Sequence, residues 1–240
     1  YDEINVTPML DLAYVLLVAW LLLRGGEFMI VFAMSTSGFG GGPGESPLTA
    51  FFGGTVLFYI TILTFVPAIT MRFVAEEYRS GNIDSLLSAP ITEASVVFGK
   101  YLAGLIIWTA MWVPTLFYVF LTSRFGDIDL GATLARYIGV LGLGSHFVAL
   151  GLLGSTIART QISAFLIGFM FLAGLFMLGL VAFVANEEST REIWNYISVW
   201  EHMTTFGRGI VDSRYLVYDL TMTVIPLFIT HRIFVARRLS

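Results

Sequence analysis

The sequence contains no cysteine and very little charge. Without cysteine, the chain has no disulfide framework and no thiolate metal site. Charged residues make up only 12% of the 240 residues, about half the ~25% of a typical soluble domain. Hydrophobic residues make up 57%, and the mean hydropathy is +0.82. Because so few charges cannot cover a water-facing surface, we expect lipid to be the solvent for most of the chain.

The motifs of several functional classes are also missing. The net charge of −4 is small and spread along the chain, which argues against a nucleic-acid partner. Gly99-Lys100 lacks the upstream glycine of GxxxxGK[ST], so no loop here would hold a nucleotide phosphate. There is no HExxH motif or pair of facing intramembrane aspartates, and His202 and His231 lack metal-ligand spacing. We therefore expect no catalytic residue, metal or cofactor in this chain.

Six apolar runs are about long enough to cross a bilayer as helices. They predict an all-α fold, a polytopic membrane bundle of about six helices in a single domain. Arg24 and Glu27 interrupt the first run, but their spacing of three residues predicts that they pair on one helix face. Glycines are frequent in the fourth run, which predicts close packing at the centre of the bundle. The expected spans are 12–34, 51–71, 101–122, 137–158, 162–185 and 215–234.

The basic residues predict the orientation of these spans. With an even number of spans both termini share a side, and seven basic residues fall on that side against five on the other. The excess predicts cytoplasmic termini. The polar stretch 72–99 is then cytoplasmic, and the stretch 186–214 lies outside the membrane on the far face. We expect this outer stretch either to form short, partly re-entrant helices that gate an exit or to be an interface-anchored loop.

The cytoplasmic stretch has its own helical pattern. Ile83, Leu86 and Leu87 are spaced at i, i+3 and i+4, which predicts a short amphipathic helix on the membrane surface. Pro90 closes this segment, and a new helix start follows at Thr92. The apolar face of such a helix either rests on the bundle or docks in the groove of a partner.

The same stretch resembles a known family. Thr70 to Glu77, Arg79-Ser80-Gly81, Leu86-Leu87, Ala89-Pro90 and Gly99-Lys100 are similar to the type-2 ABC transporter permeases, especially the gliding-motility-associated six-span branch. Two further parts of the chain resemble the same branch, so that the likeness covers about residues 50–240. They are Leu150 to Leu153 with Arg159-Thr160-Gln161, and Phe206 to Arg214 with the basic Arg237-Arg238 tail.

The resemblance implies a function and a set of coupling residues. In that family the segment after the second span is a coupling helix that contacts a cytoplasmic ATPase subunit, where ATP and Mg²⁺ are bound. The chain would then be the permease of a bacterial inner-membrane exporter, paired with a second permease copy or a homologous permease and surrounded by membrane lipid. Asn82-Ile83-Asp84 departs from the Thr-x-Glu common in the family. The implied coupling contacts are Glu76, Glu77, Arg79, Gly81 and Asp84.

A second resemblance is confined to the first 20 residues. The segment from Asp2 to Ala13 is similar to the start of the ExbD/TolR family of proton-driven motor subunits. In that family an aspartate at the beginning of a single span carries the proton, and Asp11 has the matching position. The alternative function is therefore a proton-coupled motor component, or a membrane scaffold subunit.

Two polar residues within the spans are candidates for a transport pathway. His146 lies in the fourth span beside Ser145, with no acid at a spacing that would complete a catalytic triad. We expect it either to bond a neighbouring helix or to line the pathway. Asp219 lies about one turn into the last span, where it would pair with a basic residue or line the pathway. The substrate cannot be read from these residues.

Overall fold

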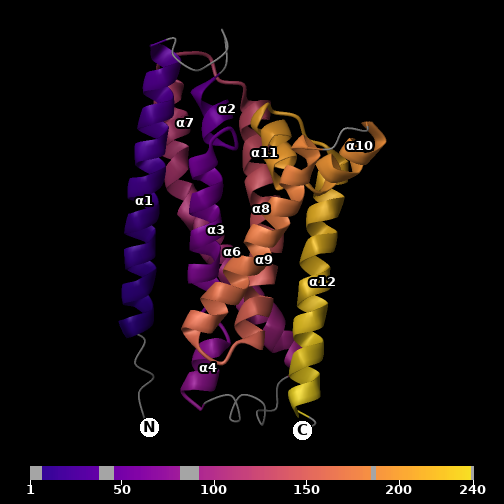
Figure 1. Ribbon diagram of the computed structural model, residues 1–240. Coiled ribbons are helices and arrows are strands. Elements are labelled where there is room, and N and C mark those ends of the chain that lie inside the picture. The colour runs from indigo at the N-terminus through magenta and orange to yellow at the C-terminus, as the bar shows by residue number, and fades with distance from the viewer. Residues whose placement is uncertain (1–6, 38–45, 82–91, 185–187, 239–240) are drawn as a thin grey trace.

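The computed structural model describes residues 7–37, 46–81, 92–184 and 188–238 (Figure 1). Throughout these ranges the regular structure is helical, without a strand, which confirms the predicted all-α fold. The helices are α1 (Thr7–Thr36), α2 (Pro47–Phe51), α3 (Val56–Thr70), α4 (Ala75–Arg79), α6 (Glu93–Trp112), η1 (Val113–Thr115), α7 (Leu116–Thr122), α8 (Leu130–Ile157), α9 (Gln161–Leu180), η2 (Val181–Phe183), α10 (Glu188–Ile197), α11 (Val199–Gly207) and α12 (Ser213–Arg238).

Within the described residues, five helical stretches are long and apolar enough to cross a membrane. They are Tyr14–Thr36, Glu93–Thr122, Leu130–Ile157, Gln161–Phe183 and Ser213–Arg238. Pro114 lies in the 3₁₀ turn between α6 and α7, where the missing N–H of proline interrupts the α-helical hydrogen bonds. With the shorter apolar helix α3, these stretches make a polytopic helical membrane protein.

The helix in the predicted second span, 51–71, is α3, and the short helix α2 precedes it and ends at Phe51. α3 has 15 residues, about 22 Å of helix at 1.5 Å per residue, which is less than a hydrocarbon core of ~30 Å. Ser46 caps α2 and Thr55 caps α3, each with a side-chain oxygen. Gly53 in the turn between them has φ +150°, and a Cβ there would lie 2.8 Å from Met203. In Figure 1, α2 lies beyond the end of α3, so both short helices together run beside α1.

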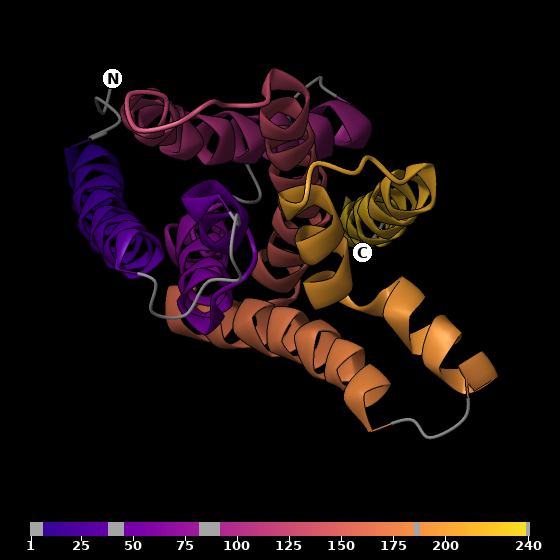
Figure 2. The ribbon, with the colours of Figure 1, turned by 90° about the horizontal axis from the view of Figure 1, so that it is seen from above.

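α8 lies at the centre of the bundle, as its glycines predict. It packs against α12, α9, α11, α3 and α6, and Figure 2 shows it among these helices. Of its most apolar stretch, 72% is buried, compared with 28% for α1 and for α9. Gly154 of α8 approaches the backbone of Gly168 in α9, where a Cβ on Gly154 would be 3.0 Å from the Gly168 Cα. The absence of a side chain therefore permits the two helices to lie close together.

The two ends of the bundle carry different elements. α4, the last turns of α12 and the beginning of α1 lie at the lower end in Figure 1, whereas α2, α10 and α11 lie at the upper end. α10 and α11 show that the stretch 186–214 contains short helices, and the predicted gating of an exit by this stretch stays a prediction. α11 is embedded among α8, α9 and α2, with Val199, Met203 and Phe206 fully buried.

The predicted pair of Arg24 and Glu27 is confirmed. Both side chains are buried, with 1% and 3% of their surface exposed, and Arg24 donates a hydrogen bond to Glu27. The Arg24 guanidinium also donates to the backbone carbonyl of Phe51 at 2.9 Å and lies 4.0 Å from the centroid of the Phe51 ring. Glu27 accepts a further hydrogen bond from the Thr55 hydroxyl. This ion pair therefore connects α1 to the turn between α2 and α3.

Candidate functional site

The predicted coupling residues lie on and after the short helix α4. Glu76, Glu77 and Arg79 belong to α4 itself, and Gly81 follows it with φ +72°. Asp84 lies outside the described residues. So does the amphipathic pattern of Ile83, Leu86 and Leu87, whose predicted helix stays a prediction. We call Met71 to Gly81, with α4 in its middle, the coupling segment.

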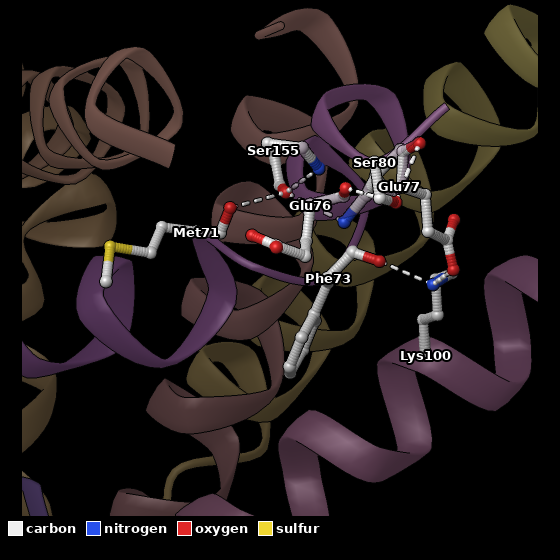
Figure 3. Close-up of polar contacts among 9 residues, drawn as sticks. Met71, Phe73, Glu76, Glu77, Ser80, Lys100 and Ser155 are labelled. Carbon is white, nitrogen blue, oxygen red and sulfur yellow. Dashed lines mark hydrogen bonds and ion pairs between the residues drawn. The ribbon is translucent and has the colours of Figure 1, made fainter. Parts of the chain in front are cut away.

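A serine from another helix holds the beginning of the coupling segment. The hydroxyl of Ser155 in α8 accepts hydrogen bonds from the backbone N–H groups of Val74 and Ala75, at 3.0 and 3.2 Å. It also donates to the backbone carbonyl of Met71 at 3.2 Å (Figure 3). The residue at the N-cap of α4 is Val74, which has no side-chain oxygen for this purpose. The cap of α4 is therefore supplied by α8.

Lys100 of α6 makes the second connection. Its ammonium group donates to the backbone carbonyl of Phe73 and forms an ion pair with Glu77, with 2.5 Å between Nζ and Oε1 (Figure 3). The two side chains are 19% and 25% exposed. A partly buried ion pair is screened less by salt than a surface pair. Glu77 thus attaches α4 to α6.

Gln161, at the start of α9, makes the third connection. Its side-chain amide donates a hydrogen bond to the Glu76 carboxylate. Arg79 also pairs with Glu76, at 3.2 Å, but its own side chain is 65% exposed. Ser80 and Gly81 are exposed as well. Among the predicted coupling residues in the described part of the chain, the two glutamates bond to other helices, whereas Arg79 and Gly81 are exposed.

The C-terminal helix also lies against this end of the bundle. The Arg237 guanidinium lies 4.6 Å from the centroid of the Tyr78 ring in α4. Arg238 pairs with Glu93 at the start of α6, with 2.6 Å between the charged atoms. The coupling segment is thus in contact with α6, α8, α9 and α12.

The two pathway candidates form a pair in the interior. Nδ1 of His146 in α8 and Oδ1 of Asp219 in α12 are 2.9 Å apart, although their relative orientation is not that of a hydrogen bond. His146 is fully buried and Asp219 is 3% exposed. The second carboxylate oxygen of Asp219 occupies the space that a Cβ atom on Gly142 would need. An ionisable neighbour of Asp219 is thus a histidine on an adjacent helix, and the pathway role of both residues stays a prediction.

His202 of α11 adds a third ionisable group to this pair. Its Nδ1 lies 4.0 Å from Asp219 Oδ1, and its Nε2 donates to the backbone carbonyl of Tyr196 at 2.9 Å. Burial lowers the pKa of His202 from 6.5 to about 4, despite the nearby Asp219 charge. His202 is therefore neutral at pH 7, with its proton on Nε2, because a carbonyl oxygen only accepts hydrogen bonds. No local pattern in the sequence indicated a role for His202, since only the packing of α11 brings its side chain close to Asp219.

A cavity of about 490 Å³ opens beside His202 at the upper end of the bundle. α10, α11 and the start of α12 line it with Glu192, Glu201 and Arg214 among other residues. Tyr196 and Tyr215 also line it, and the ring of Tyr215 stacks on His202 with 4.0 Å between centroids. Hydrogen bonds from Arg214 lower the pKa of Asp212, just before α12. The lining of the cavity combines charged side chains with apolar surface, and α10 and α11, which help to line it, lie at the end of the bundle opposite α4 (Figure 1).

Two of the three residues that hold the coupling segment fall within motifs of the family resemblance. Lys100 belongs to Gly99-Lys100 and Gln161 to Arg159-Thr160-Gln161, but neither motif indicated a contact with α4. Ser155 carried no sequence signal, because a serine in an apolar helix is commonly bonded to its own backbone. Asp11 lies in α1, and its proton-carrying role stays a prediction. No cluster of three His, Asp or Glu side chains suited to a metal occurs in the described parts of the chain.

Comparison with known protein families shows which family the chain belongs to. Searches among curated proteins and among solved structures gave no match. The family model described as "ABC-2 family transporter protein" matches residues 11–236. That range begins within α1, ends near the end of α12 and includes the coupling segment. The chain therefore belongs to the ABC-2 transporter family, as a membrane permease component.

Proposed function

We propose that this permease is the membrane subunit of an ABC exporter and that α4 transmits movement from a separate cytoplasmic ATPase subunit. ATP and Mg²⁺ bind to that subunit, and no cofactor is needed in this chain. The observation that carries the proposal is the attachment of α4 to three helices, through Ser155, Lys100 and Gln161. A displacement applied to so short a helix would be shared by α8, α6 and α9.

Arg79, Gly81 and Asp84 are the proposed direct contacts with the ATPase. The exposure of Arg79 supports this role, and Gly81 has open space around its α-carbon. Glu76 and Glu77 act in coupling through their internal pairs, which hold α4 at the correct position. This division refines the set of contacts that the family resemblance implies.

A second permease copy, or a homologous permease, completes the proposed transporter. The faces of α1 and α9 support this, because large apolar residues such as Leu22 and Met170 are exposed there, at 71% and 69%. Lipid covers the apolar faces that the second permease leaves free. The pathway would lie at the interface between the two permeases.

The membrane and orientation follow from the same proposal. The chain lies in a bacterial inner membrane with cytoplasmic termini, so that α4 reaches the ATPase. The basic side chains of Arg79, Lys100 and Arg238 support this orientation, since they lie at the α4 end of the bundle. The stretch 186–214, including α10 and α11, would then be extracytoplasmic.

His146 and Asp219 would take part in the pathway only in a second arrangement of the helices. Both are buried between α8 and α12 in this structure. Closure of the ATPase dimer would favour an arrangement in which α8 and α12 separate and α11 withdraws from them. This is a two-state equilibrium biased by ATP binding. α10 and α11 would form the gate on the outer side.

Affinity purification in mild detergent tests the ATPase partnership. We expect an ATPase subunit to be recovered with the wild-type chain and to be lost with Arg79→Glu. The matched control is Arg208→Glu, an exposed arginine after α11 at the opposite end. Recovery of the ATPase with Arg79→Glu, or equal loss with both variants, would contradict the proposal.

The alternative of a proton-driven motor predicts a different result from the same purification. The chain would be recovered with a multi-subunit motor, and Asp11→Asn would abolish activity without any effect of Arg79→Glu. Under our proposal, Asp11→Asn leaves recovery of the ATPase subunit unchanged.

A further inference from the structure

Ser155 has a bonding arrangement that differs from those of the other hydroxyl groups near it. A serine hydroxyl has one proton to donate and two lone pairs that accept. Ser155 uses all three, on Met71, Val74 and Ala75. The adjacent Thr156 is also fully buried, but its hydroxyl donates only to Leu152 in its own helix, at 2.8 Å.

The contacts of Ser155 are also the most buried of those that hold the coupling segment. Ser155, Val74 and Ala75 have 0% of their surface exposed. The side chains of Lys100 and Glu77 are partly exposed, so water can replace their mutual contact. Breaking the Ser155 contacts without replacement would leave two buried backbone N–H groups unsatisfied, which is costly. A displacement of α4 is therefore expected to carry α8 with it.

We propose that Ser155 is a positioning residue that makes α4 and α8 move as one body when the ATPase changes state. The inference rests on the proposed function of α4. α8 is the suitable receiver, because it is the central helix and carries His146 about two and a half turns from Ser155. Movement at the cytoplasmic end thereby reaches the pair of His146 and Asp219 through a single continuous helix.

A purely local capping role is the competing explanation. Capping would require only that some oxygen accept from the first N–H groups of α4. A Val74→Ser substitution places such an oxygen on α4 itself. The double variant Val74→Ser/Ser155→Ala would then keep a capped α4 while removing its link to α8.

Spin-label distances in the complex with the co-purified ATPase test the proposal. Because the chain has no cysteine, pairs of introduced cysteines can be labelled without background. One pair joins Leu22 in α1 to Ser80 at the C-cap of α4, and the other joins Leu22 to Leu130 at the outer start of α8. These three residues are exposed, and Ser80 is not one of the proposed ATPase contacts. Distances are compared without nucleotide and with ATP and vanadate.

In the wild type we expect both distances to shift on nucleotide trapping. In Ser155→Ala and in the double variant we expect the Leu22–Ser80 shift to persist, whereas the Leu22–Leu130 shift falls to less than half. Thr156→Ala and Ser155→Thr, which preserve the link, should retain both shifts. If Ser155→Ala does not fold, the double variant alone tests whether the link between α4 and α8 is needed.

Two results would overturn the inference. They are a full Leu22–Leu130 shift in the unlinked variants, or an equal loss of that shift in Thr156→Ala. Failure of the proposed function is distinguishable, because the wild type itself would then recover no ATPase or show no Leu22–Ser80 shift.

Discussion

The Nδ1 atom of His146 lies 2.9 Å from the Oδ1 atom of Asp219, and this contact joins α8 to α12 inside the bundle. The two residues are 73 positions apart in the sequence, so their proximity depends wholly on how the helices pack. Ionisable groups within membrane spans are rare and usually face a partner or a cavity. Here each provides the partner of the other.

Loss of the Asp219 side chain should destabilise the protein. Asp219→Ala removes a buried side chain that packs against His146 and Gly142, and we expect a loss of about 0.5–3 kcal/mol in the free energy of unfolding. Thermal unfolding in detergent measures the change. Asp212→Ala is the control, because this carboxylate pairs with an Arg214 side chain that is 74% exposed and such surface pairs contribute little to stability. Equal effects of the two substitutions would contradict this account.

The glycine at position 142 should be required by the same carboxylate. A Cβ at Gly142 would meet the Asp219 carboxylate, so Gly142→Ala must displace that side chain. We expect a cost of about 1–3 kcal/mol, typical of an overpacked core. Gly174→Ala in α9 is the matched control, because no atom lies within 4 Å of its added Cβ. It should be neutral or stabilise the helix by roughly 0.5–1 kcal/mol. Thermal unfolding compares the two, and the reverse order would reject the packing argument.

Two ion pairs with the same i, i+3 spacing should differ in strength. Arg24–Glu27 is buried, whereas the Arg79 side chain of the Glu76–Arg79 pair is 65% exposed. Removing one member of the buried pair by Glu27→Ala should cost ~3–5 kcal/mol, because an uncompensated charge remains inside. Arg79→Ala should cost only ~0–1 kcal/mol. The Arg24→Met/Glu27→Met double variant should be more stable than Glu27→Ala. A double variant less stable than that single one would contradict the explanation from desolvation.

Burial of His202 should make stability depend on pH. Its folded-state pKa is about 4, below the ordinary 6.5, so the unfolded chain binds the proton more readily. The contribution of His202 to the free energy of unfolding is therefore fully present above pH ~6.5, and it is lost as the pH falls from ~6.5 toward ~4. Between pH 7 and pH 5 the loss is roughly 2 kcal/mol. His202→Gln should reduce this dependence in thermal unfolding. An unchanged pH dependence in His202→Gln would argue against a buried neutral histidine.

Local sequence patterns predicted the features that depend on neighbouring residues. The apolar runs, with few charges, identified the long helices, because a span in lipid must satisfy its backbone hydrogen bonds internally. The three-residue spacing of Arg24 and Glu27 predicted their ion pair, since residues at that spacing share a helix face. The glycines of the fourth run predicted a central helix, because small residues allow close approach. The family resemblance located the coupling segment just after the second apolar run.

Other features depended on contacts between distant parts of the chain. The second run is too short as α3 alone, and only the turn at Gly53, packed against Met203, shows how α2 continues it. His202 reaches Asp219 because α11 folds back into the bundle. Glu76 and Glu77 carry the charges expected of residues that contact a partner. In the structure, however, their carboxylates bond to side chains of other helices, Glu76 to Gln161 and Glu77 to Lys100.

The sequence by itself determined that this protein is a bundle of membrane helices with a polar segment after the second apolar run, because solvent preference and helical period are local properties. Only the tertiary structure decided what holds that segment. The cap of α4 comes from Ser155, 81 residues after Val74, and no local pattern links these positions. Hydrogen bonds between helices depend on which faces meet, and that is set by the packing of the whole bundle.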